Sequence, residues 1–257
     1  MTLSRKEFLM SLGGAAVGVP LGVVGQRWRY REPPPPEPVP PPPEHGVRSY
    51  SQGGEDVIVN CCFDLLGIKD ITYLDIGAYD PIVINNTYFF YLKGARGVLV
   101  EPNVAMCEKL RAVRPEDKTL TAGIGVTAVR EADYYIMSEP SWNTFSREEA
   151  EHMEKSTNGK ITIQKVIKMP LLNINDVMAE HFQKAPTFVS IDAEGLHFDI
   201  LKAIDYQRFR PKVICIETMV SGTNKTIPEI PKFMAEKDYV ARGGSLVNTI
   251  FVDSKLL

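Results

Sequence analysis

The chain has 257 residues, of which 44% are hydrophobic and 24% are charged, and this composition excludes a fully disordered chain, a collagen and a polytopic membrane protein. Its formal net charge of −3 argues against a nucleic-acid binder, because such domains are usually strongly basic. Composition divides the chain into residues 1–31, 32–46 and 47–257.

Residues 1–31 have the order of charges and apolar residues that is typical of a targeting segment. Arg5 and Lys6 precede an uncharged run over 8–25. As a helix this run would be about 27 Å long, against a bilayer core of about 30 Å. The start resembles a twin-arginine export signal with a lysine in the second position. The alternatives are an uncleaved membrane anchor and a disordered tail, and for an anchor the three arginines after the run predict a domain facing the cytoplasm.

Residues 32–46 form a proline-rich linker, with nine of the chain's 19 prolines between 33 and 43. Proline fixes φ and has no backbone donor, so this stretch cannot join a helix or a sheet. We expect a semi-rigid polyproline II spacer. The remaining residues, 47–257, show neither a repeat nor a second linker, and we interpret them as one domain.

Short apolar runs alternate with helical patterns through this domain. The runs lack period-two alternation, which is typical of strands covered on both faces. The order therefore predicts an α/β fold with a mostly parallel, seven-stranded sheet. We expect helices over 55–66, 86–93, 104–113, 195–204 and 227–236, and strands over 71–76, 97–100, 120–126, 134–137 (an outlying strand), 187–191, 212–216 and 249–253.

Four of these strands end in a carboxylate, namely Asp75, Glu101, Asp192 and Glu217. Ligands of parallel sheets bind beyond the carboxyl ends of the strands, so these side chains are candidates for binding a polar ligand. The alternative for each is that it caps the helix that follows.

The loop after the first strand indicates which class of cofactor to expect. Gly77 permits a sharp turn and a close ligand, and Glu101 follows at the end of the next strand, where it could accept hydrogen bonds from ribose hydroxyls. The loop has no Gly-x-Gly-x-x-Gly pattern, and the chain has no Gly-Lys-Ser/Thr phosphate loop. A cationic adenosine cofactor without phosphate, such as S-adenosylmethionine, suits acidic groups better than NAD does.

In these motifs the domain resembles the FkbM-type methyltransferase family of class I S-adenosylmethionine-dependent enzymes. The resemblance runs from about residue 50 to 218 and implies a Rossmann-like, doubly wound fold. The matching stretches are Tyr50-Ser51-Gln52 with Glu55-Asp56, Tyr73-Leu74-Asp75-Ile76-Gly77-Ala78-Tyr79-Asp80-Pro81, Asn86-Thr87-Tyr88, Gly97-Val98-Leu99-Val100-Glu101-Pro102-Asn103 and Ser190-Ile191-Asp192-Ala193-Glu194-Gly195, with Arg210-Pro211-Lys212 before Glu217-Thr218.

The resemblance also implies roles for individual residues. Asp192 would face the transferred methyl group and orient or deprotonate an acceptor hydroxyl, and Glu194 is a second candidate for that task. Gln52 and Glu55 would close the pocket from the N-terminal helix. The other cofactor-binding residues would be Asp75, Gly77 and Ala78 in the first loop, Glu101 at the ribose, Pro102 and Asn103 beside the adenosine, and Ile124 near the adenine.

Three local features keep two interpretations each. Asp192 could instead cap a helix. His197 could be a base, although a packed or surface histidine is the simpler interpretation. The stretch 141–149 could be a lid over the acceptor, or a helix start with Ser146 and Glu149 as a capping box.

The four cysteines have no metal-ligand spacing, so we expect buried thiols and no metal site. Free thiols and a cofactor made inside cells favour the cytoplasm or the cytoplasmic face of a membrane, whereas the signal-like start favours export. We expect O-methylation of a small-molecule or glycan acceptor, such as a sugar or a secondary metabolite, and no nucleic-acid partner. The alternatives are a membrane-tethered cofactor-binding module without turnover and an NAD-dependent Rossmann enzyme.

Overall fold

The computed structural model describes residues 46–193, 195–219 and 225–257. The predicted targeting segment and the linker up to residue 45 lie outside these residues, as does Glu194. Within the described ranges, no helix is both long enough and apolar enough to span a membrane.

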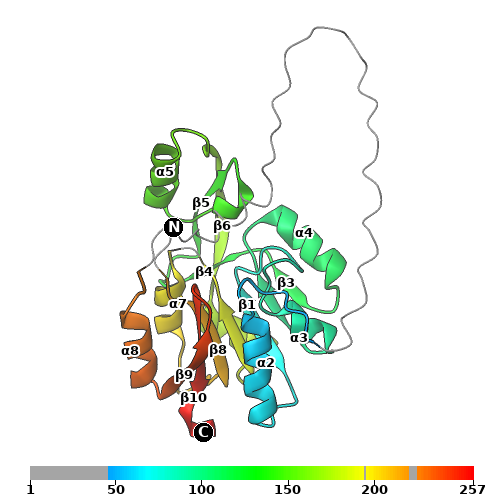
Figure 1. Cartoon of the computed structure of the whole chain (residues 1–257). Helices are drawn as coiled ribbons and strands as arrows, with labels where there is room; N and C mark the ends of the chain where they lie inside the picture. The colour runs from blue at the N-terminus through cyan, green and yellow to red at the C-terminus, as the bar shows by residue number, and fades with distance from the viewer. Residues whose placement is uncertain (1–45, 194, 220–224) are drawn as a thin grey trace.

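Within the described residues, seven strands form one sheet in the spatial order β3-β2-β1-β7-β8-β10-β9 (Figure 1). Every neighbouring pair is parallel except those that involve β10, which runs antiparallel to β8 and β9. The predicted mostly parallel, seven-stranded α/β sheet is therefore confirmed. The strands are β1 (Thr72–Ile76), β2 (Arg96–Val100), β3 (Lys118–Leu120), β7 (Phe188–Ile191), β8 (Val213–Glu217), β9 (Tyr239–Gly244) and β10 (Asn248–Asp253).

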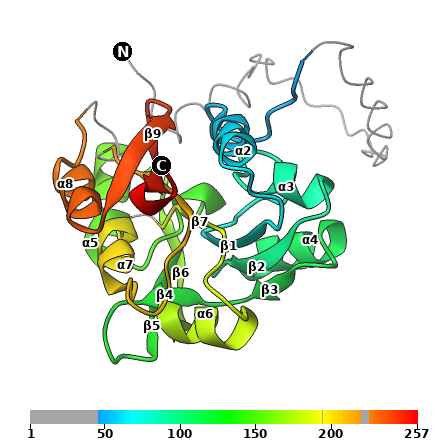
Figure 2. The ribbon, with the colours of Figure 1, turned by 90° about the horizontal axis from the view of Figure 1, so that it is seen from below.

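Helices cover both faces of this sheet (Figure 2). One face packs against α2 (Glu55–Leu65), α3 (Tyr88–Leu92) and α4 (Val104–Val113), and the other against α6 (Ile174–His181), α7 (His197–Ala203) and α8 (Glu229–Glu236). Within β1, Leu74 and Ile76 pack on the face that α6, α7 and α8 cover, whereas Tyr73 packs on the face that α2, α3 and α4 cover. Apolar side chains on both faces explain why the strands showed continuous apolar runs.

A smaller unit is inserted between β3 and α6 and lies beyond the carboxyl ends of the main parallel strands (Figure 1). Its sheet has the order β4-β6-β5, with β4 (Gly123–Gly125), β5 (Glu131–Met137) and β6 (Ile163–Asn173). A 3-10 turn (Pro140–Trp142) and α5 (Arg147–Ser156) complete it. Its own small core consists of Tyr135, Met137, Trp142, Ala150 and Ile161.

One strand prediction was wrong in detail, and one predicted strand lies outside the main sheet. The run 120–126 is two short strands in different sheets, because β3 pairs with β2 whereas β4 pairs with β6. The run 134–137 belongs to β5 of the inserted unit and not to the main sheet. The seventh main strand is instead β9, in which only Tyr239 is buried, so it had no apolar run to reveal it.

Candidate functional site

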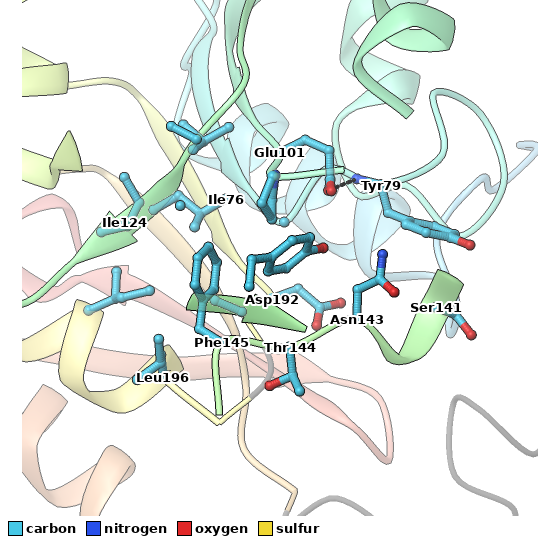
Figure 3. A pocket seen from close by; sticks show the side chains of 18 of the residues that line it. Ile76, Tyr79, Glu101, Ile124, Ser141, Asn143, Thr144, Phe145, Asp192 and Leu196 are labelled. Atoms are coloured by element: carbon cyan, nitrogen blue, oxygen red, sulfur yellow. Dashed lines mark hydrogen bonds between the residues drawn. The ribbon is translucent and has the colours of Figure 1, made fainter. Parts of the chain in front are cut away.

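A pocket opens at the carboxyl edge of the main sheet, where the strand order reverses between β1 and β7 (Figure 3). The ends of β1, β2 and β7 form one side of it, and residues of the inserted unit form the other. Doubly wound sheets bind ligands at this switch point. Of the predicted site residues, Gly77, Glu101, Pro102, Ile124 and Asp192 line the pocket.

At Gly77 the backbones of two loops touch. Gly77 has a left-handed φ of 81°, and the Asp192 amide donates to the Ile76 carbonyl at 2.9 Å. A β-carbon at Gly77 would lie 2.0 Å from the carbonyl oxygen of Asp192. Only glycine fits this position, and it leaves bare backbone facing the pocket.

Glu101 is held in place at the end of β2. One carboxylate oxygen accepts the Tyr79 amide at 2.9 Å (Figure 3). The other accepts the Asn103 amide at 2.7 Å. Glu101 does not cap the next helix, because Asn103 does so by accepting from the Ala105 amide. A carboxylate oxygen can accept more than one hydrogen bond, so Glu101 can bind hydroxyls of a ligand in the pocket. Asn103 itself does not line the pocket.

Asp75 and Ala78 lie beside the pocket and not on its wall. The side chains of a strand alternate between its faces, so Asp75 lies on the face opposite to Ile76, which lines the pocket. Its carboxylate is 3% exposed and accepts a hydrogen bond from Thr87 Oγ1 at 2.7 Å. Ala78 is buried in the core beneath α2 and α3.

The pocket lining includes neither Gln52 nor Glu55. Glu55 is fully buried at the start of α2 and accepts hydrogen bonds from Ser245 Oγ at 2.6 Å and Asn248 Nδ2 at 2.8 Å. Burial would raise the pKa of Glu55, but the hydrogen bonds from Asn248, Ser245 and the Gly53 amide outweigh it and hold the pKa below its ordinary value. Glu55 therefore ties α2 to the β9–β10 turn.

The apolar end of the pocket combines Ile124 with two aromatic residues that the sequence analysis did not select. The rings of Tyr134 and Phe145 lie 4.7 Å apart between centroids, tilted by 45°. A β-carbon at Gly123 would lie 2.5 Å from Phe145 Cζ, so this glycine makes room for the ring. The pocket thus offers an apolar, aromatic surface for a planar ligand group. The sequence feature that could have pointed to Phe145 is its place in the stretch 141–149, for which one interpretation was a lid over the acceptor.

The stretch 141–149 contains both a helix start and residues that line the pocket. Ser146 caps α5 by accepting a hydrogen bond from the Glu149 amide at 3.2 Å. Just before it, Ser141, Asn143 and Thr144 line the pocket (Figure 3). The Glu149 side chain does not close a capping box and instead accepts from Thr144 Oγ1 at 3.0 Å.

The charged side chains among the described lining residues all have the same sign. Among the described lining residues, Glu101 and Asp192 are acidic and none is lysine, arginine or histidine. Such a pocket suits a cation or a ligand rich in hydroxyls, and it opposes phosphate groups, which bind where donors and positive charge gather.

Asp192 does not cap α7, whose N-cap is Leu196. It directly follows Ile191, which pairs with Ile216, so Glu217 ends the neighbouring strand β8 beside it. Glu217 Oε2 lies 3.9 Å from His197 Nδ1, and both side chains are nearly buried. His197 is therefore a packed histidine, and the pocket lining includes neither it nor Glu217.

All four cysteines are free thiols. Cys107 and Cys215 are buried as expected, and burial raises the pKa of both. The expectation was wrong for Cys61, which is exposed at the outer face of α2. No group of three metal-ligating side chains occurs among the described residues.

A family model described as the methyltransferase FkbM domain matches residues 75–241 of this chain. Its match covers the pocket, the end of β1, the strands β2, β7 and β8, and the whole inserted unit. A comparison with curated proteins found no match.

Three of the similar solved structures are methyltransferases. A TehB-like SAM-dependent methyltransferase from Corynebacterium glutamicum is 8% identical, with 78% of this chain and 88% of that chain covered and a TM-score of 0.41. A precorrin-6y C5,15-methyltransferase from Geobacter metallireducens is 13% identical, with coverages of 72% and 80% and a TM-score of 0.39. An O-methyltransferase from Bacillus cereus is 12% identical, with 82% of each chain covered and a TM-score of 0.36.

Proposed function

The chain belongs to the FkbM methyltransferase family and is an S-adenosylmethionine-dependent methyltransferase, and we propose that it methylates a hydroxyl oxygen of a small polar acceptor. The acceptor class that we propose is a sugar, a glycan or a secondary-metabolite alcohol. The observation that carries the proposal is the acidic pocket at the β1/β7 switch point, with Glu101 and Asp192 on its wall.

The residues present fit the cofactor. Glu101 would accept hydrogen bonds from the ribose hydroxyls, and the bare backbone at Gly77 would accommodate the amino-acid part of the cofactor. Ile124, Tyr134 and Phe145 would pack against the adenine. The absence of cationic side chains among the described lining residues suits a cofactor that is a cation and has no phosphate.

Asp192 is the residue that we propose acts on the acceptor. When bound, S-adenosylmethionine supplies an electrophilic methyl carbon on its sulfonium. A neutral hydroxyl must lose its proton as its oxygen is methylated, and the Asp192 carboxylate can orient that hydroxyl and accept the proton. General bases of this kind contribute roughly 10²–10⁴-fold to the rate. Ser141, Asn143 and Thr144 line the side of the pocket formed by the inserted unit, and polar side chains there can hold further hydroxyls of a sugar-like acceptor.

Calorimetry with S-adenosylhomocysteine tests the cofactor half of the proposal. We expect Glu101→Gln to weaken binding about 10–100-fold, because hydrogen bonds to a charged group are worth roughly 1.5–3 kcal/mol. The control is Glu236→Gln, an exposed acid at the end of α8, which should bind like the wild type. A wild-type protein that is folded and does not bind would contradict the proposal.

The acceptor half needs a separate measurement. The full chain is incubated with S-adenosylmethionine labelled in its methyl group and with matched sugars that carry either a hydroxyl or an amine. We expect label in methyl ethers, and a large loss of this label in Asp192→Asn with cofactor affinity retained. Label on nitrogen alone would refute the choice of oxygen as acceptor atom.

A further inference from the structure

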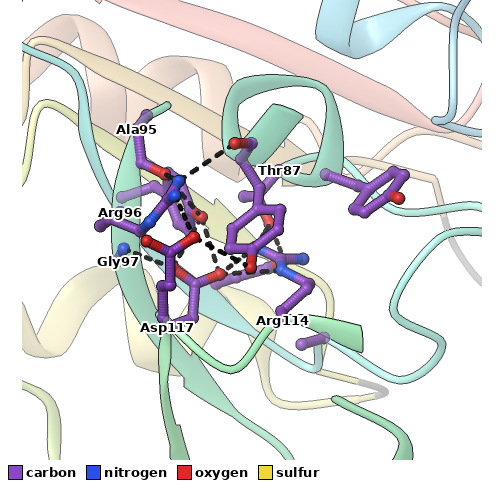
Figure 4. Close-up of polar contacts among 12 residues, drawn as sticks. Thr87, Ala95, Arg96, Gly97, Arg114 and Asp117 are labelled. Atoms are coloured by element: carbon purple, nitrogen blue, oxygen red, sulfur yellow. Dashed lines mark hydrogen bonds and ion pairs between the residues drawn. The ribbon is translucent and has the colours of Figure 1, made fainter. Parts of the chain in front are cut away.

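A buried cluster of polar side chains lies behind the cofactor loop, on the face of the sheet that carries α3 and α4 (Figure 4). Its centre is Arg114, the residue after α4, whose side chain is fully buried. Its partner Asp117 is buried as well, and the two form an ion pair at 2.8 Å. Neither residue lines the pocket.

The guanidinium of Arg114 donates to three different residues at once. Nε donates to Asp117 at 2.8 Å, Nη1 to Asn85 Oδ1 at 3.0 Å and Nη2 to Thr87 Oγ1 at 2.9 Å. Its carbon atom lies 5.4 Å from the ring centroid of Tyr73 and 5.3 Å from that of Tyr91. A planar fork with fixed donors can make this set of contacts, whereas the point charge of a lysine cannot.

The first branch of the cluster reaches the cofactor loop through Asn85. The Asn85 side-chain amide donates to the carbonyls of Ala78 and Asp80, each at 3.0 Å. These carbonyls flank Tyr79, which lines the pocket, donates its amide to Glu101 and has a left-handed φ of 47°. A non-glycine residue in that region persists only when its surroundings hold it there. Asn85 supplies that hold on both sides of Tyr79.

The second branch reaches Asp75 through Thr87. Thr87 Oγ1 accepts from Arg114 and lies 2.7 Å from Asp75 Oδ2 and 3.1 Å from Asn85 Oδ1. Its single proton goes to Asp75, because this contact is the shorter one and its acceptor is a carboxylate. Both branches therefore start at Arg114 and end at the two sides of Gly77. Asp75 precedes that glycine in β1, and Tyr79 follows it.

A buried ion pair is weak evidence for stability, because desolvation offsets most of its attraction. The geometry of the Arg114–Asp117 pair offers a better reason for its presence than stability does. We propose that Arg114 is the positioning residue of the cofactor site, and that through Asn85 and Thr87 it holds the end of β1 at Asp75 and the loop Gly77–Asp80 in the conformation that shapes the pocket. This inference rests on the proposed function, since the site that it positions is the cofactor site.

The test compares conservative variants of the full chain by calorimetry with S-adenosylhomocysteine and by urea unfolding. We expect Arg114→Lys and Thr87→Val to raise Kd about 10-fold, as the loss of a charge-assisted hydrogen bond in each predicts. Thr87→Ser keeps the hydroxyl and should restore most of the affinity. If Arg114→Lys does not fold, the comparison of Thr87→Val with Thr87→Ser tests the proposal by itself.

The matched control is Arg210→Lys. Arg210 makes a two-pronged pair with Asp253 at 2.8 and 2.6 Å, at the edge of the sheet away from the pocket. It should lower stability and leave Kd unchanged. Equal weakening by Arg210→Lys, or wild-type affinity in both Arg114→Lys and Thr87→Val, would overturn the positioning role.

A second readout separates this inference from the proposed function. In the ligand-free protein, hydrogen exchange at the amides of Gly77 to Asp80 should be faster in Arg114→Lys and Thr87→Val than in Arg210→Lys. Unchanged exchange would overturn the inference even if the wild type binds the cofactor product. Failure of the folded wild type to bind, with exchange changed as expected, would instead overturn the proposed function and leave Arg114 as a residue that orders the loop.

Discussion

At the scale of single residues, two glycines with the same backbone conformation differ in what surrounds them. Gly77 and Gly94 both have left-handed φ angles, of 81° and 91°. A β-carbon would meet the Asp192 carbonyl at Gly77, and it would meet nothing within 4 Å at Gly94. The conformational requirement is the same in both, and only the neighbour differs.

This pair predicts different results for the same substitution. Gly94→Ala should cost about 1 kcal/mol, the penalty for a side chain in the left-handed region. Gly77→Ala should cost more than that and should abolish binding of S-adenosylhomocysteine, because the loops after β1 and β7 must separate. Urea unfolding and calorimetry measure the two effects. Retained binding in Gly77→Ala would show that the close approach of these loops does not shape the site.

At the scale of elements, one buried carboxylate joins the start of α2 to β9 and β10, the last two strands in the order of the main sheet. Glu55 receives hydrogen bonds from Ser245 and Asn248, which lie in and after the β9–β10 turn. These contacts place the start of α2 at the carboxyl edge, near Glu217, which pairs with Asn248. The helix thereby closes the edge of the sheet next to the pocket and not the pocket itself.

The lowered pKa of Glu55 predicts how stability depends on pH. Because the folded-state pKa lies below the ordinary 4.5, the charged carboxylate stabilises the fold above about pH 4.5 and loses this contribution as the pH falls through the folded-state pKa. Glu55→Gln should therefore lower the free energy of unfolding by about 1–3 kcal/mol at pH 7. The difference from wild type should shrink below pH 4.5. Urea titrations at several pH values, with exposed Glu108→Gln as control, measure it, and a difference that grows in acid would contradict the assignment.

At the scale of the whole molecule, the described residues form two cores on the two faces of one sheet and a third in the inserted unit. The cores draw on residues from α2 to β10, so we expect the domain predicted over 47–257 to fold without residues 1–46. We propose that residues 8–25 serve a separate purpose, which is to hold this domain at the cytoplasmic face of a membrane.

Removing residues 1–46 tests both statements. The shortened chain should keep its urea midpoint and bind S-adenosylhomocysteine within about twofold of the full chain, because the described cores and pocket lining consist of residues within 47–257. The full chain should appear in the membrane fraction of cells and the shortened chain in the soluble fraction. A full chain that is soluble, or exported and shortened, would refute the anchor.

The sequence by itself determined the class of the fold and the strand-end carboxylates. Continuous apolar runs require burial on both faces, and residues at the ends of parallel strands must meet at one edge. It therefore predicted Gly77, Glu101 and Asp192 at the pocket.

Only the tertiary structure decided which neighbouring residues reach the pocket. Asp75 turns away because strand side chains alternate, and Asn103 is taken up by a helix cap. Tyr134 and Phe145 arrive from the inserted unit, and Arg114 reaches Asn85 across 29 residues of chain. Contacts between distant segments depend on how the elements pack, and local periodicity carries no information about that packing.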